Sequence, residues 1–196
     1  MFDINILTPE DRELFTAILG STYHEPDLTI APDGNPYIYR WHVIPHNDQA
    51  NVYLHVQVAS DPERPLHDHP WDNQSVILSG GYTELVGDTW NPECVKLQAV
   101  RKKGDVIWRK AHWSHRLILP GHHPYTMTLF TTGPKVREWG FWMPDGWRSY
   151  KEMTELHNGV SILKEHAHDH SPTHAEGRPQ DEGHQAAPCV PLGSPE

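Results

Sequence analysis

The chain has 196 residues, 26 acidic against 16 basic side chains and a formal net charge of −10 at pH 7. This length suits one domain with a core of ordinary size. The acidic balance argues against a nucleic-acid partner, because there is no basic excess to neutralise phosphates. No apolar run approaches the ~20 residues of a membrane span, and the charged start lacks a signal-peptide core. The two cysteines, Cys94 and Cys189, do not indicate a disulfide framework, so we expect a cytoplasmic protein.

Residues 1–36 are expected to form an N-terminal helix and a lead-in to the main domain. In LTPEDRELFTAILG, Thr8 is an N-cap residue, Pro9 occupies the first helical position and Gly20 is a stop signal. Residues 149–163 contain SYKEMTELHNG and predict a second short helix. The sequence thus places its helices at the two ends of the domain.

Residues 37–148 are typical of a β-rich domain. In NVYLHVQVAS, apolar Val52, Leu54 and Val56 alternate with Tyr53, His55 and Gln57, which is the pattern of a strand with two unlike faces. Further strands are expected within 37–45, 75–87, 95–120, 125–133 and 137–143. Gly80-Gly81 and Lys103-Gly104 punctuate them, and many short strands with such punctuation predict a sandwich or barrel.

The last segment, residues 164–196, is rich in His, Pro, Gly and acidic residues and contains few large apolar side chains. Such a segment cannot bury enough surface to offset its ordering entropy, so it predicts a disordered tail. EHAHDHSPTH is typical of weak metal traps, although a solvated tail without function is the favoured interpretation.

Two histidines in LHDHPW, His67 and His69, are spaced for one metal ion. Alternate residues of an extended segment point to the same face, and two neutral imidazoles on one face can bind a transition metal. The third ligand is expected from His115 in KGDVIWRKAHWSHRLIL, with His112 on the other side of a corner.

These residues resemble the two motifs of the cupins, G(X)5HXH(X)3-4E(X)6G and G(X)5PXG(X)2H(X)3N. HXH falls on His67-Asp68-His69, its closing glycine on Gly80, the opening glycine of the second motif on Gly104 and its histidine on His115. The resemblance spans roughly residues 37–142 and implies an all-β fold, a cupin-type jelly-roll β-barrel with short terminal helices and a metal inside.

The chain departs from the cupin motifs at several positions. Asn73 stands where the first motif has its glutamate, and the alternative spacing gives Gln74. Lys110, His112 and Leu119 replace the proline, glycine and asparagine of the second motif, and Asp61 replaces the opening glycine of the first. Asp72 would restore a carboxylate if the Pro70-Trp71 corner turned it inward, whereas Asn73 would bind weakly through its carbonyl or hold a metal-bound water.

A three-His set adds no ligand charge, so a bound divalent ion keeps its double charge and attracts anions. Among cupins, such a set resembles the thiol dioxygenases and some diketone-cleaving dioxygenases, which implies Fe(II); Zn, Ni or Mn are the alternatives. The first hypothesis is therefore a non-haem iron dioxygenase acting on a small, anionic molecule. The second is a non-redox cupin: a small-molecule binding or sensing protein, or a sugar-type isomerase or epimerase with a Lewis-acid metal. The third is a barrel that has lost its metal.

Several polar residues are candidates for the substrate cavity. Arg40, Arg116 and Arg137 are possible anion clamps, because a guanidinium grips a carboxylate in a bidentate way. Tyr82 and Tyr125 are further hydrogen-bond donors, and we assign the catalytic role to Tyr82 and Arg116. The face carrying Tyr53, His55 and Gln57 either lines the cavity or is solvated, with the valines in the core. Cupins often pair through sheet edges, so a homodimer is the default expectation.

Overall fold

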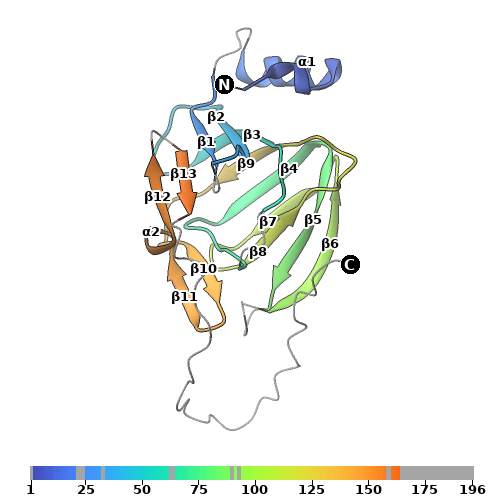
Figure 1. Ribbon diagram of the computed structural model, residues 1–196. Coiled ribbons are helices and arrows are strands. Elements are labelled where there is room, and N and C mark those ends of the chain that lie inside the picture. The colour runs from blue at the N-terminus through green and yellow to red at the C-terminus, as the bar shows by residue number, and fades with distance from the viewer. Residues whose placement is uncertain are drawn as a thin grey trace, which may run out of the picture.

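The computed structural model describes residues 2–163 apart from 21–24, 32–33, 62–64, 89–90, 92–93 and 158–159 (Figure 1). The expected tail, residues 164–196 with its histidines and Cys189, lies outside the described residues. The elements in chain order are η1 (Ile4–Ile6), α1 (Pro9–Leu19), β1 (Leu28–Ile30), β2 (Ile38–His42), β3 (Asn51–Gln57), β4 (Asn73–Ser79), β5 (Gly81–Gly87), β6 (Val95–Lys102), β7 (Val106–Arg109), β8 (His115–Ile118), β9 (Thr126–Thr132), β10 (Gly140–Met143), β11 (Gly146–Ser149), α2 (Tyr150–Met153), β12 (Thr154–His157) and β13 (Val160–Leu163).

The strands form two larger sheets and one hairpin, which confirms the all-β prediction. One sheet has eight strands in the order β12-β13-β1-β2-β3-β9-β4-β7, the second has the order β6-β5-β8, and β10 pairs with β11. All pairs are antiparallel except β1 with β13. Among the described strands no ladder joins the two larger sheets, so the all-β fold is not closed by hydrogen bonds.

The chain crosses from the eight-stranded to the three-stranded sheet at Gly80-Gly81, the predicted break. Gly80 has a φ of +70°, a region that side-chain-bearing residues rarely adopt. A Cβ on Gly81 would lie 2.4 Å from the Arg101 carbonyl oxygen, so the close pairing of β5 with β6 excludes a side chain there. The chain returns to the larger sheet through the predicted turn at Lys103-Gly104.

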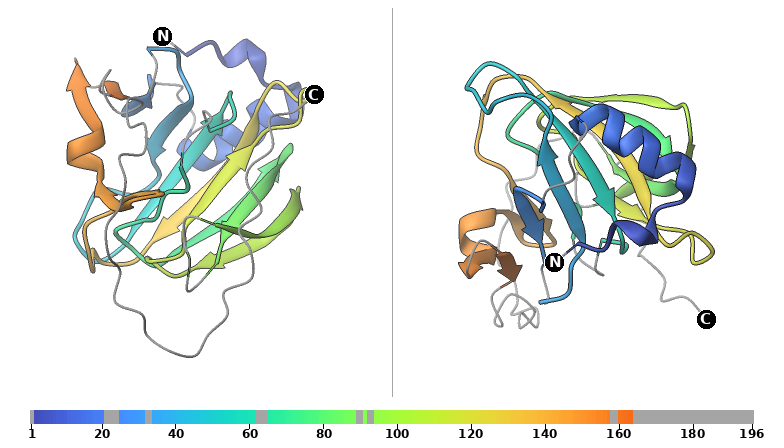
Figure 2. Two further views of the ribbon diagram at one scale, coloured as in Figure 1. Left: turned by 60° about the horizontal axis from the view of Figure 1, so that its bottom comes forward. Right: turned by 90° about the horizontal axis from the view of Figure 1, so that it is seen from above.

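Helix α1 covers the outer face of the eight-stranded sheet (Figure 2). Its N-terminus is as predicted: the Thr8 hydroxyl accepts a hydrogen bond from the Asp11 amide at 3.2 Å. Phe15 packs against Trp41 with ring centroids 4.9 Å apart, and both belong to a core cluster that includes Leu54 and Val56 of β3. The apolar face of β3 is therefore buried under the helix, which leaves the opposite face for the interior.

The C-terminal part of the domain differs from the prediction. Only Tyr150–Met153 are helical within the expected helix 149–163, and the chain continues as the β12–β13 hairpin. Thr154 has an extended backbone, with φ −129° and ψ 157°, which ends the helix after one turn. The sequence carries a hairpin signal here, Asn158-Gly159, which outweighs the helical pattern. This hairpin and β1, both outside the expected barrel range of 37–148, join the eight-stranded sheet.

No helix within the described ranges has the length and apolar character needed to cross a bilayer.

Candidate metal centre

The structure brings His67, His69 and His115 together. His67 and His69 lie just before the Pro70-Trp71 corner, and His115 begins β8. Two backbone hydrogen bonds join these segments: His67 N donates to His115 O at 3.0 Å, and His115 N donates to His67 O at 2.9 Å. One ring nitrogen from each of the three residues lies within 4.8 Å of the others. The Nε2 atoms of His69 and His115 are 2.8 Å apart.

This donor set fits a divalent transition metal. Imidazole nitrogen suits iron, zinc, copper and nickel, and three such ligands leave further positions open for water or substrate. Burial, followed by the charges of His115, His67 and Arg109, holds the pKa of His69 well below its usual range. A neutral imidazole is the form that binds a metal.

A carboxylate that the sequence analysis did not single out, Glu84, fixes the orientation of His115. Its Oε1 lies 2.8 Å from His115 Nδ1, and its side chain is only 1 % exposed. Because Nδ1 faces this carboxylate, Nδ1 carries the proton and the Nε2 lone pair is left for the cluster. A carboxylate behind a histidine is the usual arrangement around metal-bound imidazoles.

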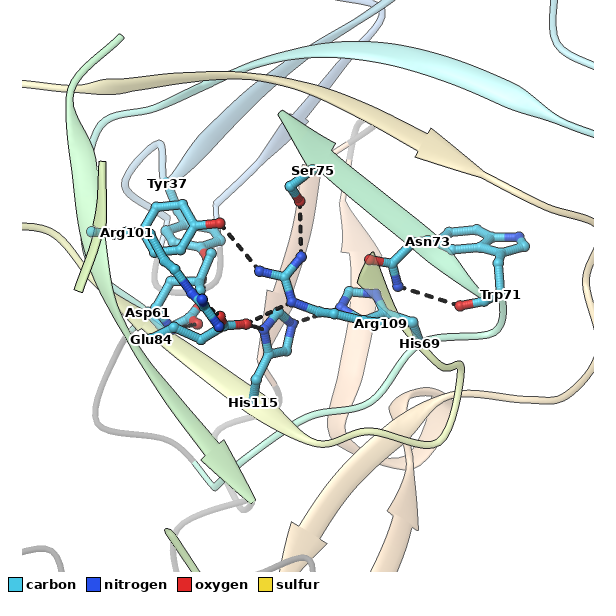
Figure 3. Close-up of polar contacts among 12 residues, drawn as sticks. Tyr37, Asp61, His69, Trp71, Asn73, Ser75, Glu84, Arg101, Arg109 and His115 are labelled. Carbon is cyan, nitrogen blue, oxygen red and sulfur yellow. Dashed lines mark hydrogen bonds and ion pairs between the residues drawn. The ribbon is translucent and has the colours of Figure 1, made fainter. Parts of the chain in front are cut away.

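Glu84 is held in turn by two arginines (Figure 3). Arg109 Nε donates to Oε1 at 2.6 Å and Arg101 Nε donates to Oε2 at 2.8 Å. Burial alone would raise the pKa of Glu84, but the hydrogen bond from His115 and the charge of Arg109 outweigh it and hold the pKa far below its usual range. Glu84 therefore stays an anion directly behind the three-His cluster.

Arg109 connects this carboxylate to two hydroxyl groups of the interior. Its Nη1 donates to Ser75 Oγ at 2.9 Å and its Nη2 donates to the Tyr82 hydroxyl at 3.2 Å. Tyr82 is 3 % exposed and lies on the cavity wall. The predicted donor Tyr82 thus faces the cavity, with its hydroxyl orientation set by Arg109.

The three histidines line a cavity of about 260 Å³ between the two larger sheets and the β10–β11 hairpin. Of the predicted cavity residues, Arg40, His55, Gln57 and Tyr82 contribute to its wall. The two interpretations of strand β3 are thereby resolved, because His55 and Gln57 face the interior while Leu54 and Val56 pack under α1.

Other predicted site residues lie elsewhere. Tyr53 is buried under Arg40, whose guanidinium carbon is 4.6 Å from the ring centroid. Arg137 forms an ion pair with Asp68 at 2.8 Å, and neither Arg137 nor Arg116 is part of the cavity wall. Tyr125 lies at the far end of the domain, where its hydroxyl donates to Asp11.

The structure does not bring Asp72, Asn73 or His112 to the three-His cluster. The Asp72 carboxylate is half-exposed and accepts from Lys110 Nζ at 2.7 Å and from the Ala111 amide at 2.9 Å, so the corner turns it outward. Asn73 is buried in β4, donates to the Trp71 carbonyl at 3.3 Å and is absent from the cavity wall. His112 is exposed in a turn.

No protein-family model matches the chain, and no curated protein matches its sequence. Solved structures resemble it at low identity. DMSP lyase DddQ from Ruegeria pomeroyi aligns with a TM-score of 0.47 and 15% identity over 69% of this chain and 68% of that chain. Fe(II)-HppE with the alternative substrate (S)-1-HPP aligns with a TM-score of 0.45 and 14% identity over 56% of each chain, so the present chain spans little more than half of HppE. KdgF from a Halomonas species aligns with a TM-score of 0.41 and 14% identity over 53% of this chain and 84% of that chain. These likenesses concern the all-β fold alone.

Proposed function

We propose that this chain is a metal-dependent cupin enzyme, a non-haem Fe(II) dioxygenase acting on a small anionic molecule. The observation that carries the proposal is the convergence of three imidazole nitrogens within 4.8 Å, one of them oriented by a buried carboxylate, on the wall of a closed-in cavity. His67, His69 and His115 would hold the metal, and Fe(II) would supply redox chemistry with O₂. Glu84, Arg109 and Tyr82 form the network behind them.

Arg40 supports an anionic substrate. It lies on the cavity wall, its Nε donates to His55 Nε2 at 2.9 Å, and no carboxylate in the described part of the chain pairs with it. Burial, followed by the charge of Arg40, holds the pKa of His55 well below its usual range, so His55 is neutral and does not offset the guanidinium charge. An unpaired, partly desolvated cation is costly, and a ligand carboxylate or phosphate would offset that cost.

The apolar part of the cavity wall restricts the chemical character of the rest of the substrate. Ile30, Ile38, Trp71, Phe130 and Phe141 all face the cavity. A ligand whose anionic group reaches Arg40 would therefore place an apolar body against these side chains. Gln57, Tyr82 and Thr128 are among the polar groups of the wall that would orient it.

A non-redox role is the second candidate, and the donor set itself favours it. Three histidines with no carboxylate ligand are also the ligands of catalytic zinc sites, where the metal serves as a Lewis acid. In this role the same cavity would bind or isomerise its anionic ligand without O₂.

The first test is metal content, measured by mass spectrometry on the full chain beside His115→Ala. The difference between the two isolates the three-His site from any metal bound by the histidine-rich segment 164–196. We expect about one metal ion per chain to be lost in the variant, and equal metal content in both would refute the site.

The second test is oxygen uptake by iron-loaded and zinc-loaded protein with small thiol, diketone and catechol carboxylates. O₂ consumption by the iron-loaded protein but not by the zinc-loaded protein supports the dioxygenase. Ligand turnover or binding that survives with zinc supports the second candidate. Arg40→Gln should weaken binding of every anionic ligand, whereas Arg12→Gln on the outer helix α1 should not.

A further inference from the structure

The residue between the two metal-binding histidines, Asp68, is a carboxylate with 0 % exposure. In an extended segment, neighbouring side chains point to opposite faces, so Asp68 points away from the face that carries His67 and His69. The sequence motif gives this middle position no role. The structure surrounds it with hydrogen-bond donors.

Three hydrogen-bond donors and one cation from residues 137–147 converge on this carboxylate. Asp68 Oδ1 accepts from the Gly140 amide at 2.8 Å, and Oδ2 accepts from the indole N–H groups of Trp142 at 3.2 Å and Trp147 at 3.0 Å. Arg137 Nη1 lies 2.8 Å from the same oxygen. The three donors belong to the β10–β11 hairpin, so one buried side chain holds the hairpin to the metal-binding segment.

Backbone hydrogen bonds hold the segment that carries the two histidines on two sides: His67 and His69 bond to His115 and Ala111 on one side, and the segment bonds to β10 on the other. It belongs to no strand of either larger sheet, and its pairing is limited to isolated bridges of His67 with His115 and with Phe141. The Asp68 amide also donates to the Gly140 carbonyl at 3.0 Å, and the Trp142 amide donates to the Leu66 carbonyl at 2.8 Å. The contact with β10 is therefore one of the two supports that position the segment, and it is the one that the Asp68 side chain reinforces.

The hairpin also contacts a metal-binding ring directly. The rings of Trp139 and Phe141 lie 6.4 Å and 6.3 Å from the His67 ring, centroid to centroid, and both line the cavity. Among the described strands, β10 and β11 form a two-stranded sheet of their own. A Cβ on Gly140 would lie 1.9 Å from the Arg148 carbonyl oxygen, so close pairing of β10 with β11 requires this glycine.

We propose that Asp68 is a positioning residue of the metal centre: by anchoring the β10–β11 hairpin behind His67 and His69, it sets the direction of both imidazoles and thereby the affinity and geometry of metal binding. This inference rests on the proposed function, since it requires that the three histidines bind a metal. Asp68 thereby influences metal binding without contacting the metal or the substrate.

The test uses Co(II) as the probe and the full chain as the protein. Asp68→Asn keeps the size of the side chain and one acceptor oxygen but turns an NH₂ group toward N–H donors and removes the charge partner of Arg137. The matched control is Asp11→Asn, which alters another buried carboxylate, the acceptor of hydrogen bonds from Ser79 and Tyr125 at the α1 end of the domain. His115→Ala provides the baseline for cobalt bound outside the three-His site.

We expect Asp68→Asn to bind Co(II) about 10- to 100-fold more weakly than wild type and to change the visible cobalt bands, because outer partners of metal ligands have effects of this size. Asp11→Asn should lower the melting temperature yet keep the wild-type cobalt affinity and spectrum. If folded Asp68→Asn retains both the affinity and the spectrum, the positioning role is refuted. If wild type binds no more cobalt than His115→Ala, the metal site itself is refuted instead.

Arg137→Gln keeps the inference testable should Asp68→Asn fail to fold. Arg137 is 30 % exposed at its side chain, so its replacement disturbs packing less, and it removes only the ion-pair partner of Asp68. A 3- to 10-fold weaker cobalt affinity in this variant supports the positioning role. Unchanged affinity and unchanged bands refute it.

Discussion

Glu84 holds His115 so that one ring nitrogen of the imidazole contacts the carboxylate and the other faces the three-His cluster. Glu84 Oε1 lies 2.8 Å from Nδ1, while Nε2 lies 2.8 Å from the Nε2 atom of His69. The carboxylate fixes the tautomer and the direction of the ring before any metal arrives. This relationship gives the first prediction.

Replacing Glu84 with glutamine should weaken metal binding about 10- to 100-fold, because the amide neither carries charge nor strengthens the His115 ligand. It also leaves Arg109 as a buried cation without its partner, which should lower the free energy of unfolding by about 3–5 kcal/mol. Competition titration with a chelator measures the affinity, and urea unfolding measures the stability. Glu138→Gln, at a surface ion pair with Lys135, is the control and should leave the stability close to the wild-type value. Wild-type affinity in Glu84→Gln would show that the carboxylate serves the fold alone.

The crossing between the sheets gives a prediction about stability. Gly81→Ala should destabilise the protein by about 1–3 kcal/mol or more, because the new Cβ would meet the Arg101 carbonyl oxygen at 2.4 Å and β5 would have to move from β6. Gly121→Ala is the control, since its Cβ would have no neighbour within 4 Å. Thermal unfolding of both variants compares the two sites. Equal melting temperatures would contradict the close approach of the two strands.

Much of this architecture is predictable from local sequence. The Thr8-Pro9 helix start, the alternation in β3, the Gly80-Gly81 crossing and the turn at Gly104 depend on neighbouring residues alone, and the structure has each of them. The spacing of His67 and His69 follows from strand geometry in the same way. The strand pattern around His115 indicates it as the third ligand, and the cupin resemblance points to the same residue.

The network around the histidines depends on register between distant strands, which a single sequence does not reveal. Glu84 and Arg109 stand at inward positions of β5 and β7, yet each alone resembles a surface charge in an alternating strand. In each strand the charged residue shares a face with an apolar neighbour, Tyr82 for Glu84 and Ile107 for Arg109. This pattern is the sequence feature that indicates a buried charge. The sequence leaves the direction of Asp72 open, because its outward position depends on the contacts with Lys110 and Ala111 across the corner.

The pH dependence of stability should include a contribution from His55. Burial, followed by the charge of Arg40, holds its folded-state pKa well below the ordinary 6.5, so the unfolded chain binds more protons below that pH. The free energy of unfolding is therefore unaffected by the protonation of His55 above pH 6.5 and decreases as the pH falls from 6.5 toward the folded-state pKa. His55→Gln keeps an acceptor for Arg40 and should flatten the dependence of the free energy of unfolding on pH, by at most about 1.4 kcal/mol per pH unit.

Urea unfolding of metal-free protein between pH 5 and pH 7.5 provides the measurement. Phe130→Leu is the control, since it alters packing against the same ring, 5.1 Å from His55 by centroid distance, without removing a titrating group. It should shift the curve by a similar amount at every pH. An unchanged slope in His55→Gln would mean that His55 does not contribute to the acid side of the curve.

The helix core and the metal centre lie on opposite faces of β3, and they should respond separately to mutation. Phe15 is 1 % exposed and packs against Trp41, so Phe15→Ala should lower the free energy of unfolding by about 3–5 kcal/mol. Its cobalt affinity should stay at the wild-type value at a temperature where circular dichroism shows the variant folded, because none of the ligands or their hydrogen-bond partners touches Phe15. Glu84→Gln provides the contrast, with both quantities reduced. A parallel loss of cobalt affinity in folded Phe15→Ala would mean that α1 controls the inner face of β3 through the strand itself, and that the two faces form one cooperative unit.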